Sequence, residues 1–309
     1  MRLIGKTNID FMGKRYFWYS VSAAVILTGM VSLFVKGLNY GIDFLGGTEL
    51  VVRFTQGVDV GDVRSAMDKA GFRKAEIKTF GSVRDLLIRT PEQEEGSLVA
   101  DRMKAGLKQQ FPDNPFQVQR EEKIGPKIGA ELRRDAVYAV AASLVAILLY
   151  LGIRFKFVYG MGAVIALFHD VLLTLGLVSL CDGVIPQLNL EISQTMVAAF
   201  LTLVGLSNND TVVIFDRIRE NQKIYRSMGL VEVINKSVNE VLSRTIITSG
   251  TIFTVLLVLL LFGGEVIRGF AFASLIGITT GTYSSIYIAS AIVVDWTERK
   301  RRKAQVAVA

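Results

Sequence analysis

Apolar residues gather in six long blocks along this chain of 309 residues, and polar residues dominate the stretches between the blocks. Each block is close to the ~20 residues that a helix needs to cross the hydrocarbon core of a bilayer. The pattern therefore predicts a polytopic α-helical membrane protein with six transmembrane helices. The expected helices cover residues 17–35, 136–153, 157–181, 193–215, 246–262 and 270–294.

The first block follows Lys14 and Arg15, as the apolar part of a signal peptide would. Its apolar stretch is longer than the ~7 to 15 residues typical of such a peptide, and no small-x-small cleavage site follows it. We therefore expect an uncleaved membrane anchor.

A different pattern fills residues 37–134, where short stretches alternate between strand and helix periodicity. Alternating apolar and polar residues indicate strands, and apolar residues three or four apart indicate amphipathic helices. The resulting order, β-α-β-β-α-β, is that of a ferredoxin-like α+β domain. The expected elements are a strand at 48–54, a helix at 59–72, a hairpin at 75–90, a helix at 95–111 and a strand at 115–125.

No catalytic pattern is visible in this domain. It has neither His nor Cys, and its serines lack a local base that would activate them as nucleophiles. Its acidic stretch, Glu92, Glu94 and Glu95, is most simply a solvated loop. We therefore expect a domain that binds a partner or transmits force, and not an enzyme. The glycines of GIDFLGG and GPKIG at its two ends permit tight turns where it meets the membrane.

The basic residues orient the chain, because Lys and Arg in short connections stay on the cytoplasmic side. They gather before the first helix and after the last one, whereas CDGVIPQLNLEIS carries none. We therefore expect both termini in the cytoplasm. The expected domains are 1–36 (cytoplasmic N-terminus and first helix), 37–134 (the domain outside), 135–295 (five helices with a cytoplasmic amphipathic connection at 216–244) and 296–309 (a basic cytoplasmic tail).

Composition and charge exclude other classes. A content of 51% hydrophobic residues is too high for an average soluble chain. The net charge of +7 could suit nucleic acid, but the basic residues follow the membrane ends and do not gather on one face with aromatic residues. The single cysteine, Cys181, forms no intramolecular disulfide, and no His/Cys cluster has the spacing of a zinc site. We expect no nucleic acid, metal or other cofactor.

Asp210 and Arg244 are charged residues in or beside apolar blocks. A charge at the centre of a membrane helix costs ~2.5 to 3.5 kcal/mol, so each such residue is a candidate for function. If the helix ends at Leu206, SNND is an interfacial cap; the apolar TVVIF that follows favours a helix that runs on to Phe215. Arg244 either snorkels at a helix end or reaches the level of Asp210. An ion pair would favour the carboxylate, whereas burial favours the neutral acid, and a group between the two can take up and release protons.

His169 and Asp170 lie near the middle of the third block. One His and one Asp do not make a metal site without further ligands. We expect a hydrogen bond between helices, and a role in a proton path stays open. The last helix carries small residues at four-residue intervals, which allows close helix packing. They are Ala273, Gly277, Gly281, Ser285 and Ala289.

Five motifs occur together and in order between residues 11 and 298: GIDFLGGT, GPKIGAEL, NDTVVIFDRIREN, LSRTIITSGT and IRGFAFASLIGI. As a set they resemble the SecF members of the SecD/SecF family, in the RND superfamily. The resemblance implies half of an RND-type unit in the bacterial cytoplasmic (inner) membrane. It implies a heterodimer with SecD that uses the proton motive force, with protons as the coupling ion, to promote late steps of polypeptide export.

The resemblance also implies partners and site residues. The partners are the SecYEG channel, SecA, YajC/YidC, an unfolded translocating polypeptide and membrane lipid. Asp210 and Arg244 match the family's proton relay. The possible supporting residues are Asn209, Thr245, Thr248, His169 and Asp170; the expected hinge of the outer domain is Gly41, Asp43, Gly46, Gly47, Gly125 and Pro126; the expected packing residues are Gly277 and Gly281. Two positions depart from the family pattern, Asn208 beside the acid and Leu45 before the GG pair.

Two other functions stay open. A small-molecule or lipid exporter of the RND type would want a larger outer domain with a ligand cleft. In a passive assembly factor, Asp210 and Arg244 would only fix helix register as a buried pair. An intramembrane protease is the least favoured, because it needs two facing acids and no matching motif surrounds Asp170.

Overall fold

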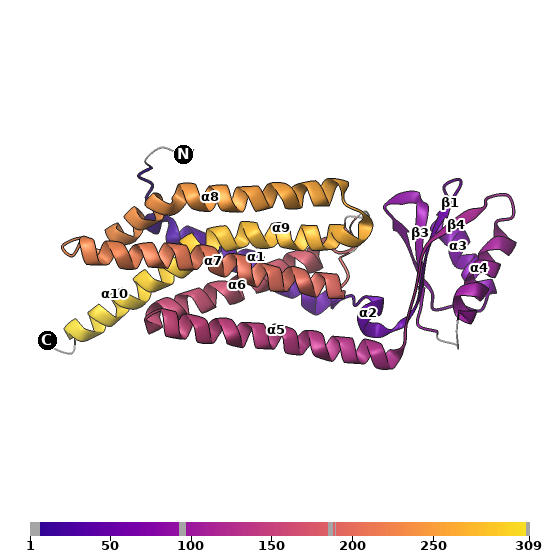
Figure 1. Ribbon diagram of the computed structural model, residues 1–309, viewed down its shortest axis with the longest axis horizontal. Coiled ribbons are helices and arrows are strands. Elements are labelled where there is room, and N and C mark those ends of the chain that lie inside the picture. The colour runs from indigo at the N-terminus through magenta and orange to yellow at the C-terminus, as the bar shows by residue number, and fades with distance from the viewer. Residues whose placement is uncertain (1–6, 93–96, 185–187, 189, 307–309) are drawn as a thin grey trace.

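The computed structural model describes residues 7–92, 97–184, 188 and 190–306. Long helices run side by side along the molecule, and a small sheet with its own helices lies at one end of them (Figure 1). The long helices are α1 (Arg15–Lys36), α5 (Pro126–Arg154), α6 (Phe157–Cys181), α7 (Gln194–Ile224), α8 (Leu230–Phe262) and α9 (Glu265–Ser284), which continues through the π-helical turn η2 (Ser285–Ala289) into α10 (Ser290–Val306).

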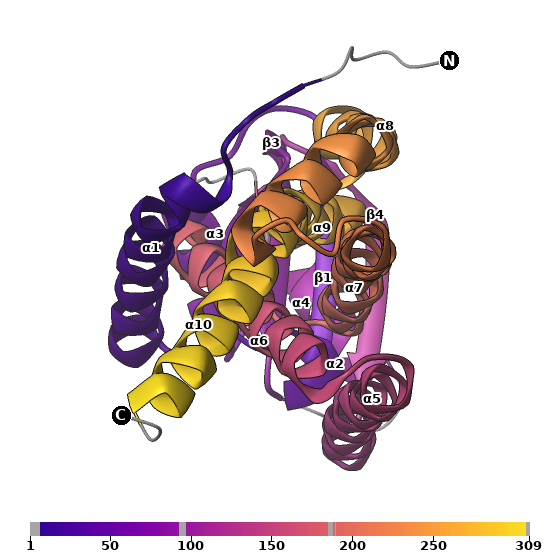
Figure 2. The same ribbon diagram turned by 90° about the vertical axis from the view of Figure 1, so that its left-hand side faces the viewer.

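Six of the described helical segments are long and apolar enough to cross a membrane, which confirms the predicted fold class. Viewed along the bundle, α1, α5 and α8 lie at its outside, with α6 and α9 nearer its middle (Figure 2). The burial agrees with this arrangement: half of the most apolar window of α6 is buried, against 6% of that of α5. The exposed apolar side chains of α5 therefore need lipid or a partner to cover them.

The helices extend well beyond the apolar blocks. α7 runs nine residues past the predicted end at Phe215, and α8 begins at Leu230, long before residue 246. The predicted connection 216–244 therefore consists of two helix ends and a short turn. Polar side chains hold these ends together: Asn221 donates to Ser237 at 2.9 Å and to Glu240 at 2.7 Å. Hydropathy marks the part of a helix that suits lipid, whereas these hydrogen bonds allow the helices to continue beyond it.

The sheet follows the predicted β-α-β-β-α-β order, as β1 (Gly47–Phe54), α3 (Val60–Lys69), β2 (Glu76–Phe80), β3 (Ser82–Thr90), α4 (Leu98–Gln110) and β4 (Phe116–Ile124). The strands lie in the order β2-β3-β1-β4 and every neighbouring pair is antiparallel. Glu94, Glu95 and the predicted start of the second helix lie outside the described residues, as do residues 1–6 of the basic N-terminus. The topology confirms a ferredoxin-like α+β region between the first two long helices.

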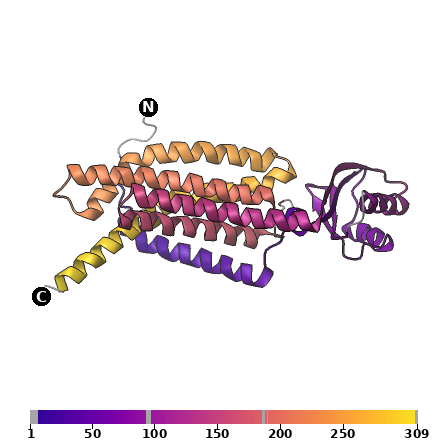
Figure 3. The same cartoon turned by 60° about the horizontal axis from the view of Figure 1, so that its bottom comes forward.

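The two faces of the sheet differ. Helices α3 and α4 cover the face that points away from the bundle (Figure 3), and residues such as Leu50, Val52 and Ile88 form the core beneath them. Because side chains alternate along a strand, the other face carries the residues between these, including Glu49 and Arg89. The register places Glu49 beside Arg89, and Arg89 beside Glu76. A row of charged residues therefore crosses the face of the sheet that points toward the bundle.

Candidate functional site

Asp210 lies inside the bundle on α7, with a residue exposure of 5%. Ser249 Oγ of α8 donates a hydrogen bond of 3.0 Å to Asp210 Oδ2. Thr282 Oγ1 of α9 lies 3.4 Å from the same oxygen and 2.9 Å from Ser249 Oγ. Three helices therefore meet at this carboxylate, and its hydrogen-bond partners are hydroxyl groups that can turn to donate or accept.

Asp170 of α6 forms a second buried carboxylate, with an exposure of 0%. Its Oδ2 accepts hydrogen bonds from Ser207 of α7 at 2.5 Å and from Ser284 of α9 at 2.7 Å. Its Oδ1 lies 2.9 Å from His169 Nδ1. The other ring nitrogen, Nε2, lies 2.9 Å from the hydroxyl of Tyr283, which in turn bonds to Ser22 of α1. A continuous chain of polar groups therefore joins α1, α6, α7 and α9.

The π-helical turn Ser285–Ala289 follows directly after the residues of α9 that bond to these carboxylates. Ser285 Oγ lies 2.7 Å from Thr211 Oγ1 of α7, next to Asp210 in the sequence. Gly281 lets the helices approach this closely, because an added Cβ would lie 2.8 Å from Ser207 Cβ. Gly277 lies against Leu203 in the same way, so the structure brings both predicted packing glycines against α7. Single-turn π-bulges inside helices occur frequently at functional sites.

Arg244 lies apart from this cluster. The sequence predicts that it can pair with Asp210, but these two described residues form no ion pair, and Arg244 is exposed. It lines a cavity of about 1270 Å³ near the N-terminal segment, together with Asn209, Ser243 and Glu240. The helices α7 and α8 therefore bring the predicted pair into one region, with a cavity instead of a direct contact beside it.

Thr245 and Thr248 are two of the supporting residues that the sequence predicts near Asp210. Thr245 is buried, and within the described part of the chain its hydroxyl has no hydrogen-bond partner. Thr248 is half-buried and its carbonyl oxygen accepts from Thr251 at 2.8 Å. The hydroxyl groups that do reach Asp210, those of Ser249 and Thr282, were missed by the sequence analysis. The signal for the second was the run TTGTYSS, which is rich in hydroxyl groups for a membrane helix.

The predicted hinge residues hold the sheet region close to the bundle. Asp43, in the short helix α2 (Ile42–Leu45), accepts a hydrogen bond of 2.8 Å from the first backbone N–H of α7, that of Gln194. Gly41 N donates to the Ile192 carbonyl oxygen at 3.0 Å. Gly46 and Gly47 follow with φ of +74° and +133°, which side chains with a Cβ rarely adopt. Gly125 and Pro126 are the N-cap and first residue of α5, so this end of the region joins a long helix directly, whereas α2 lies between α1 and β1 at the other end.

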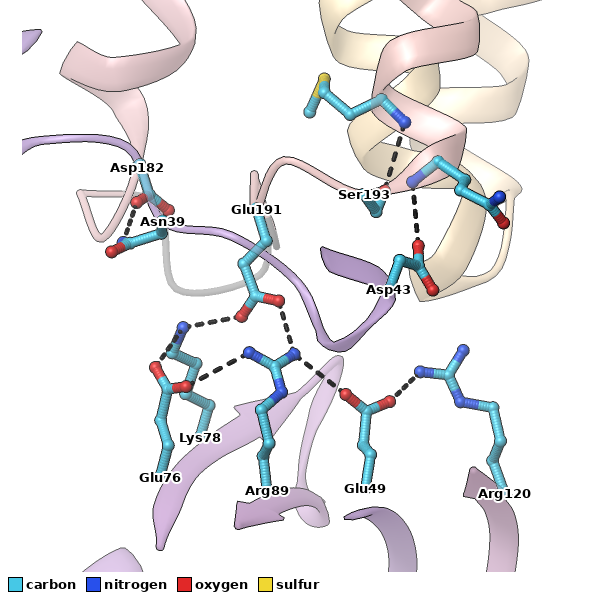
Figure 4. Close-up of polar contacts among 12 residues, drawn as sticks. Asn39, Asp43, Glu49, Glu76, Lys78, Arg89, Arg120, Asp182, Glu191 and Ser193 are labelled. Atoms are coloured by element: carbon cyan, nitrogen blue, oxygen red, sulfur yellow. Dashed lines mark hydrogen bonds and ion pairs between the residues drawn. The ribbon is translucent and has the colours of Figure 1, made fainter. Parts of the chain in front are cut away.

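A cluster of charges joins the sheet to the bundle (Figure 4). Glu191, in the connection between α6 and α7, accepts from Arg89 at 2.5 Å and from Lys78 at 2.9 Å. Arg89 also donates to Glu49 at 2.9 Å, and Glu49 bonds to Arg120. Burial of Glu191 works against its charge, but the charges and hydrogen bonds of Arg89 and Lys78 outweigh burial and lower its pKa below the ordinary value. No pattern in the sequence marks Glu191, because an acid in a connection between two helices is ordinary.

Two further observations bear on the chemistry. Among the described residues, no group of three or more His, Cys, Asp or Glu side chains is arranged to hold a metal ion. A smaller cavity of about 200 Å³ lies beside the charge cluster, lined by residues that include Glu49, Arg89, Glu191 and Gln194. Taken together, these features define a class: a multi-pass membrane protein with buried carboxylates between its helices and a ferredoxin-like sheet tied to one end.

Comparison with known proteins identifies the family. The profile described as "Protein export membrane protein SecD/SecF, C-terminal" matches residues 103–299, and that of the "SecD/SecF GG Motif" matches residues 31–58. A protein translocase subunit SecF from Rhodothermus marinus is 43% identical over 309 residues, which is all of both chains. One from Thermodesulfovibrio yellowstonii is 42% identical and covers 95% of this chain and 96% of its own. The chain therefore belongs to the SecD/SecF family, as a SecF-type protein translocase subunit.

Solved structures of SecDF agree with this assignment. The crystal structure of SecDF from Thermus thermophilus, a translocon-associated membrane protein, superposes with a TM-score of 0.83 at 39% identity over 94% of this chain. SecDF in its super-membrane-facing form gives a TM-score of 0.71 at 38% identity over the whole chain. This chain spans 39% and 41% of the lengths of those two proteins.

Proposed function

We propose that this protein pairs with SecD and uses the proton motive force to promote late steps of polypeptide export, with Asp210 as the group that binds and releases the proton. The observation that carries the proposal is a buried carboxylate whose partners are the hydroxyl groups of Ser249 and Thr282, with no ion pair to Arg244 in the described structure. Hydroxyl partners suit a group that changes charge, because they can serve both protonation states.

The cavity beside Arg244 supports a route for the proton. It is lined by Asn209 and Ser243, the neighbours in sequence of Asp210 and Arg244. In the proposed topology both termini lie in the cytoplasm, and the cavity then opens on the cytoplasmic side. Arg244 would keep other cations away from the carboxylate while protons pass through water. One charge that crosses ~100 mV releases ~2.3 kcal/mol, which is enough to bias a conformational change.

The match to SecDF and the exposed face of α5 support a partnership with SecD. This chain matches 39% of the SecDF chain, and α5 leaves most of its apolar side chains uncovered. Transporters of this kind combine two related halves around a central site. We propose that SecD supplies the other half, that the pair resides in the bacterial cytoplasmic membrane, and that SecYEG, SecA and YajC/YidC act on the same unfolded polypeptide. The sheet region then lies outside and acts as the moving part.

Replacing Asp210 by asparagine tests this function. In cells whose only copy of this chain carries Asp210→Asn, pulse-chase export of a secreted protein is expected to slow to the rate of a deletion strain, while the complex with SecD stays intact. Asp135→Asn, at an exposed acid of α5, is the matched control and should leave export unchanged. Normal export by Asp210→Asn with the proton gradient intact would refute the proton relay. That result would favour a passive assembly factor; accumulation of a small molecule or lipid in the variant would favour an exporter.

A further inference from the structure

Glu191 lies where the helical bundle meets the sheet region, and its residue exposure is 5%. Its two carboxylate oxygens bind different cations of the sheet: Oε2 accepts from Arg89 at 2.5 Å, and Oε1 accepts from Lys78 at 2.9 Å. Figure 4 shows both basic side chains rising from the sheet toward this one acid. Two ion pairs therefore cross from the bundle to the sheet at a single residue.

Further ion pairs connect this contact to all four strands of the sheet. Arg89 of β3 also pairs with Glu49 of β1 at 2.9 Å and with Glu76 of β2 at 3.3 Å. Glu49 pairs in turn with Arg120 of β4. Because the antiparallel register sets Glu76, Arg89 and Glu49 side by side, the network forms one row across the sheet. A force on Glu191 consequently acts on the whole sheet and not on one strand.

On the bundle side, Glu191 is fixed to the start of α7. Ile192 N donates to the Asn39 carbonyl oxygen at 2.7 Å, and Ser193 caps the helix by accepting from Met196 N at 3.2 Å. Asp43 binds the next free backbone N–H, that of Gln194, at 2.8 Å. Asp210 lies on the same helix, about 24 Å further along at a rise of 1.5 Å per residue. The same rigid element therefore carries the buried carboxylate and ends at the charge cluster.

We propose that Glu191 is a positioning residue that makes the sheet region follow the movements of α7. The proposal rests on the proposed function, because protonation of Asp210 supplies the movement. Buried ion pairs contribute little net stability. Here two of them join one residue of the bundle to two strands of the sheet, and such a fixed contact is what a mechanical connection needs. When Glu191 loses its charge, Arg89 keeps Glu49 and Glu76 as partners. The sheet then stays folded and loses only its fixed orientation to the bundle.

The test measures the distance between the sheet and the bundle in the complete complex with SecD. Spin labels are placed at Lys108 of α4 and at Val184, beyond the end of α6, both exposed, with Cys181 replaced by serine. The parent complex should give a narrow distance distribution by double electron–electron resonance. Glu191→Gln should broaden it and slow export about fivefold, since residues that carry coupling change it by amounts of that order. Lys78→Gln, at the half-exposed rim of the cluster, should broaden it less.

Asp85→Asn is the matched control. Asp85 is buried, like Glu191, and pairs with Arg53 at 2.6 Å, but this ion pair lies within the sheet and does not reach the bundle. The control should keep the narrow distribution and normal export. An unchanged distribution in both Glu191→Gln and Lys78→Gln would overturn the proposal.

A second measurement separates this inference from the proposed function. Asp210→Asn should shift the distance between the labels in the parent chain, and should fail to shift it when Glu191→Gln is also present. An equal shift in both backgrounds would show that the sheet follows α7 without Glu191, and would overturn this inference alone. Normal export by Asp210→Asn would refute the proposed function, whatever the label distances are.

Discussion

Ser249 of α8 donates a hydrogen bond of 3.0 Å to Oδ2 of Asp210 on α7, across 39 residues of sequence. The hydroxyl thus joins the helix that carries Arg244 to the helix that carries the buried acid. It gives the carboxylate a donor in a place where water does not supply one freely. This hydrogen bond, and not an ion pair with Arg244, defines the surroundings of Asp210 in the described structure.

We expect Ser249→Ala to reduce the export rate roughly tenfold, because a hydrogen bond to a charged group contributes ~1.5 kcal/mol or more. Pulse-chase export in cells that depend on the variant measures this. Ser143→Ala is the matched control, since the Ser143 hydroxyl bonds to the Ala139 carbonyl oxygen within α5. Equal export by the two variants would show that the proton-binding step does not use Ser249.

Substitution of Asp170 should affect the protein differently from substitution of Asp210, because Asp170 accepts hydrogen bonds from three donors in a fully buried position. Asp170→Ala leaves Ser207 and His169 without this acceptor, while Ser284 keeps the Gly281 carbonyl oxygen at 3.2 Å. Each unsatisfied buried group costs ~1 to 3 kcal/mol. We therefore expect a loss of at least ~2 kcal/mol in the free energy of unfolding, seen as a lower unfolding temperature of the purified complex.

Asp170→Asn provides the comparison for that loss. Its amide oxygen can accept from both serines, and its NH₂ can donate to His169 Nδ1 if the ring proton moves to Nε2 and points to Tyr283. The chain of hydrogen bonds then reverses its direction and stays complete. The asparagine variant should recover most of the stability lost in the alanine variant, and an equal loss in both would contradict this account.

The sequence predicts the membrane helices and the sheet because each depends on a local period. Apolar blocks of helical length and alternation of period two are properties of single segments, and they gave the six helices and the order of strands. The structure continues α7 and α8 beyond the predicted apolar blocks, and polar residues of the two extensions, such as Asn221 and Glu240, hydrogen-bond to each other. No single segment contains that information.

The hydrogen-bond partners of Asp210 could not be predicted from the sequence for the same reason. Ser249 and Thr282 approach Asp210 across 39 and 72 residues, and which hydroxyl faces the acid depends on how each helix is rotated in the bundle. Asp210 itself stood out because an acid in an apolar block has a high cost. Glu191 had no such signal, since an acid in a connection between helices is ordinary, and its burial results from the sheet above it.

Gly281 should be intolerant of even one added methyl group. A Cβ at this position would lie 2.8 Å from Ser207 Cβ and 3.0 Å from its Cα, on the facing helix α7. We expect Gly281→Ala to lower the free energy of unfolding by ~1 to 3 kcal/mol, the usual cost of overpacking. Gly205→Ala is the control, because nothing lies within 4 Å of a Cβ there. In thermal unfolding of the complex the control should be neutral or stabilising, and a loss as large as that of Gly281→Ala would contradict the packing argument.

The contact between Glu191 and the sheet should depend on pH in a defined way. Burial raises the pKa of Glu191, but the charges of Arg89 and Lys78 outweigh burial and lower its pKa below the ordinary value of 4.5. The contribution of this acid is therefore complete above that ordinary value and is lost as the pH falls through the lowered pKa. Burial alone would lower the pKa of Lys78, but Glu191 and Glu76 outweigh it and raise that pKa above 10.5. The contribution of Lys78 is thus present below 10.5 and is lost only at higher pH.

Labels at positions 108 and 184 should consequently report a constant, narrow distance distribution from about pH 6 to about pH 9, and a broad one only once the pH has fallen through the lowered pKa of Glu191, below 4.5. Other charged groups lie close to Glu191. Asp43, Glu49, Arg89, Arg120 and Glu122 line the same cavity, and Glu76 pairs with Arg89. Glu191→Gln removes the acid that titrates, so its distribution should already be broad at neutral pH and change little on acidification. If the variant instead stays narrow at pH 7 and broadens with the parent chain, another carboxylate of the cluster holds the sheet in place.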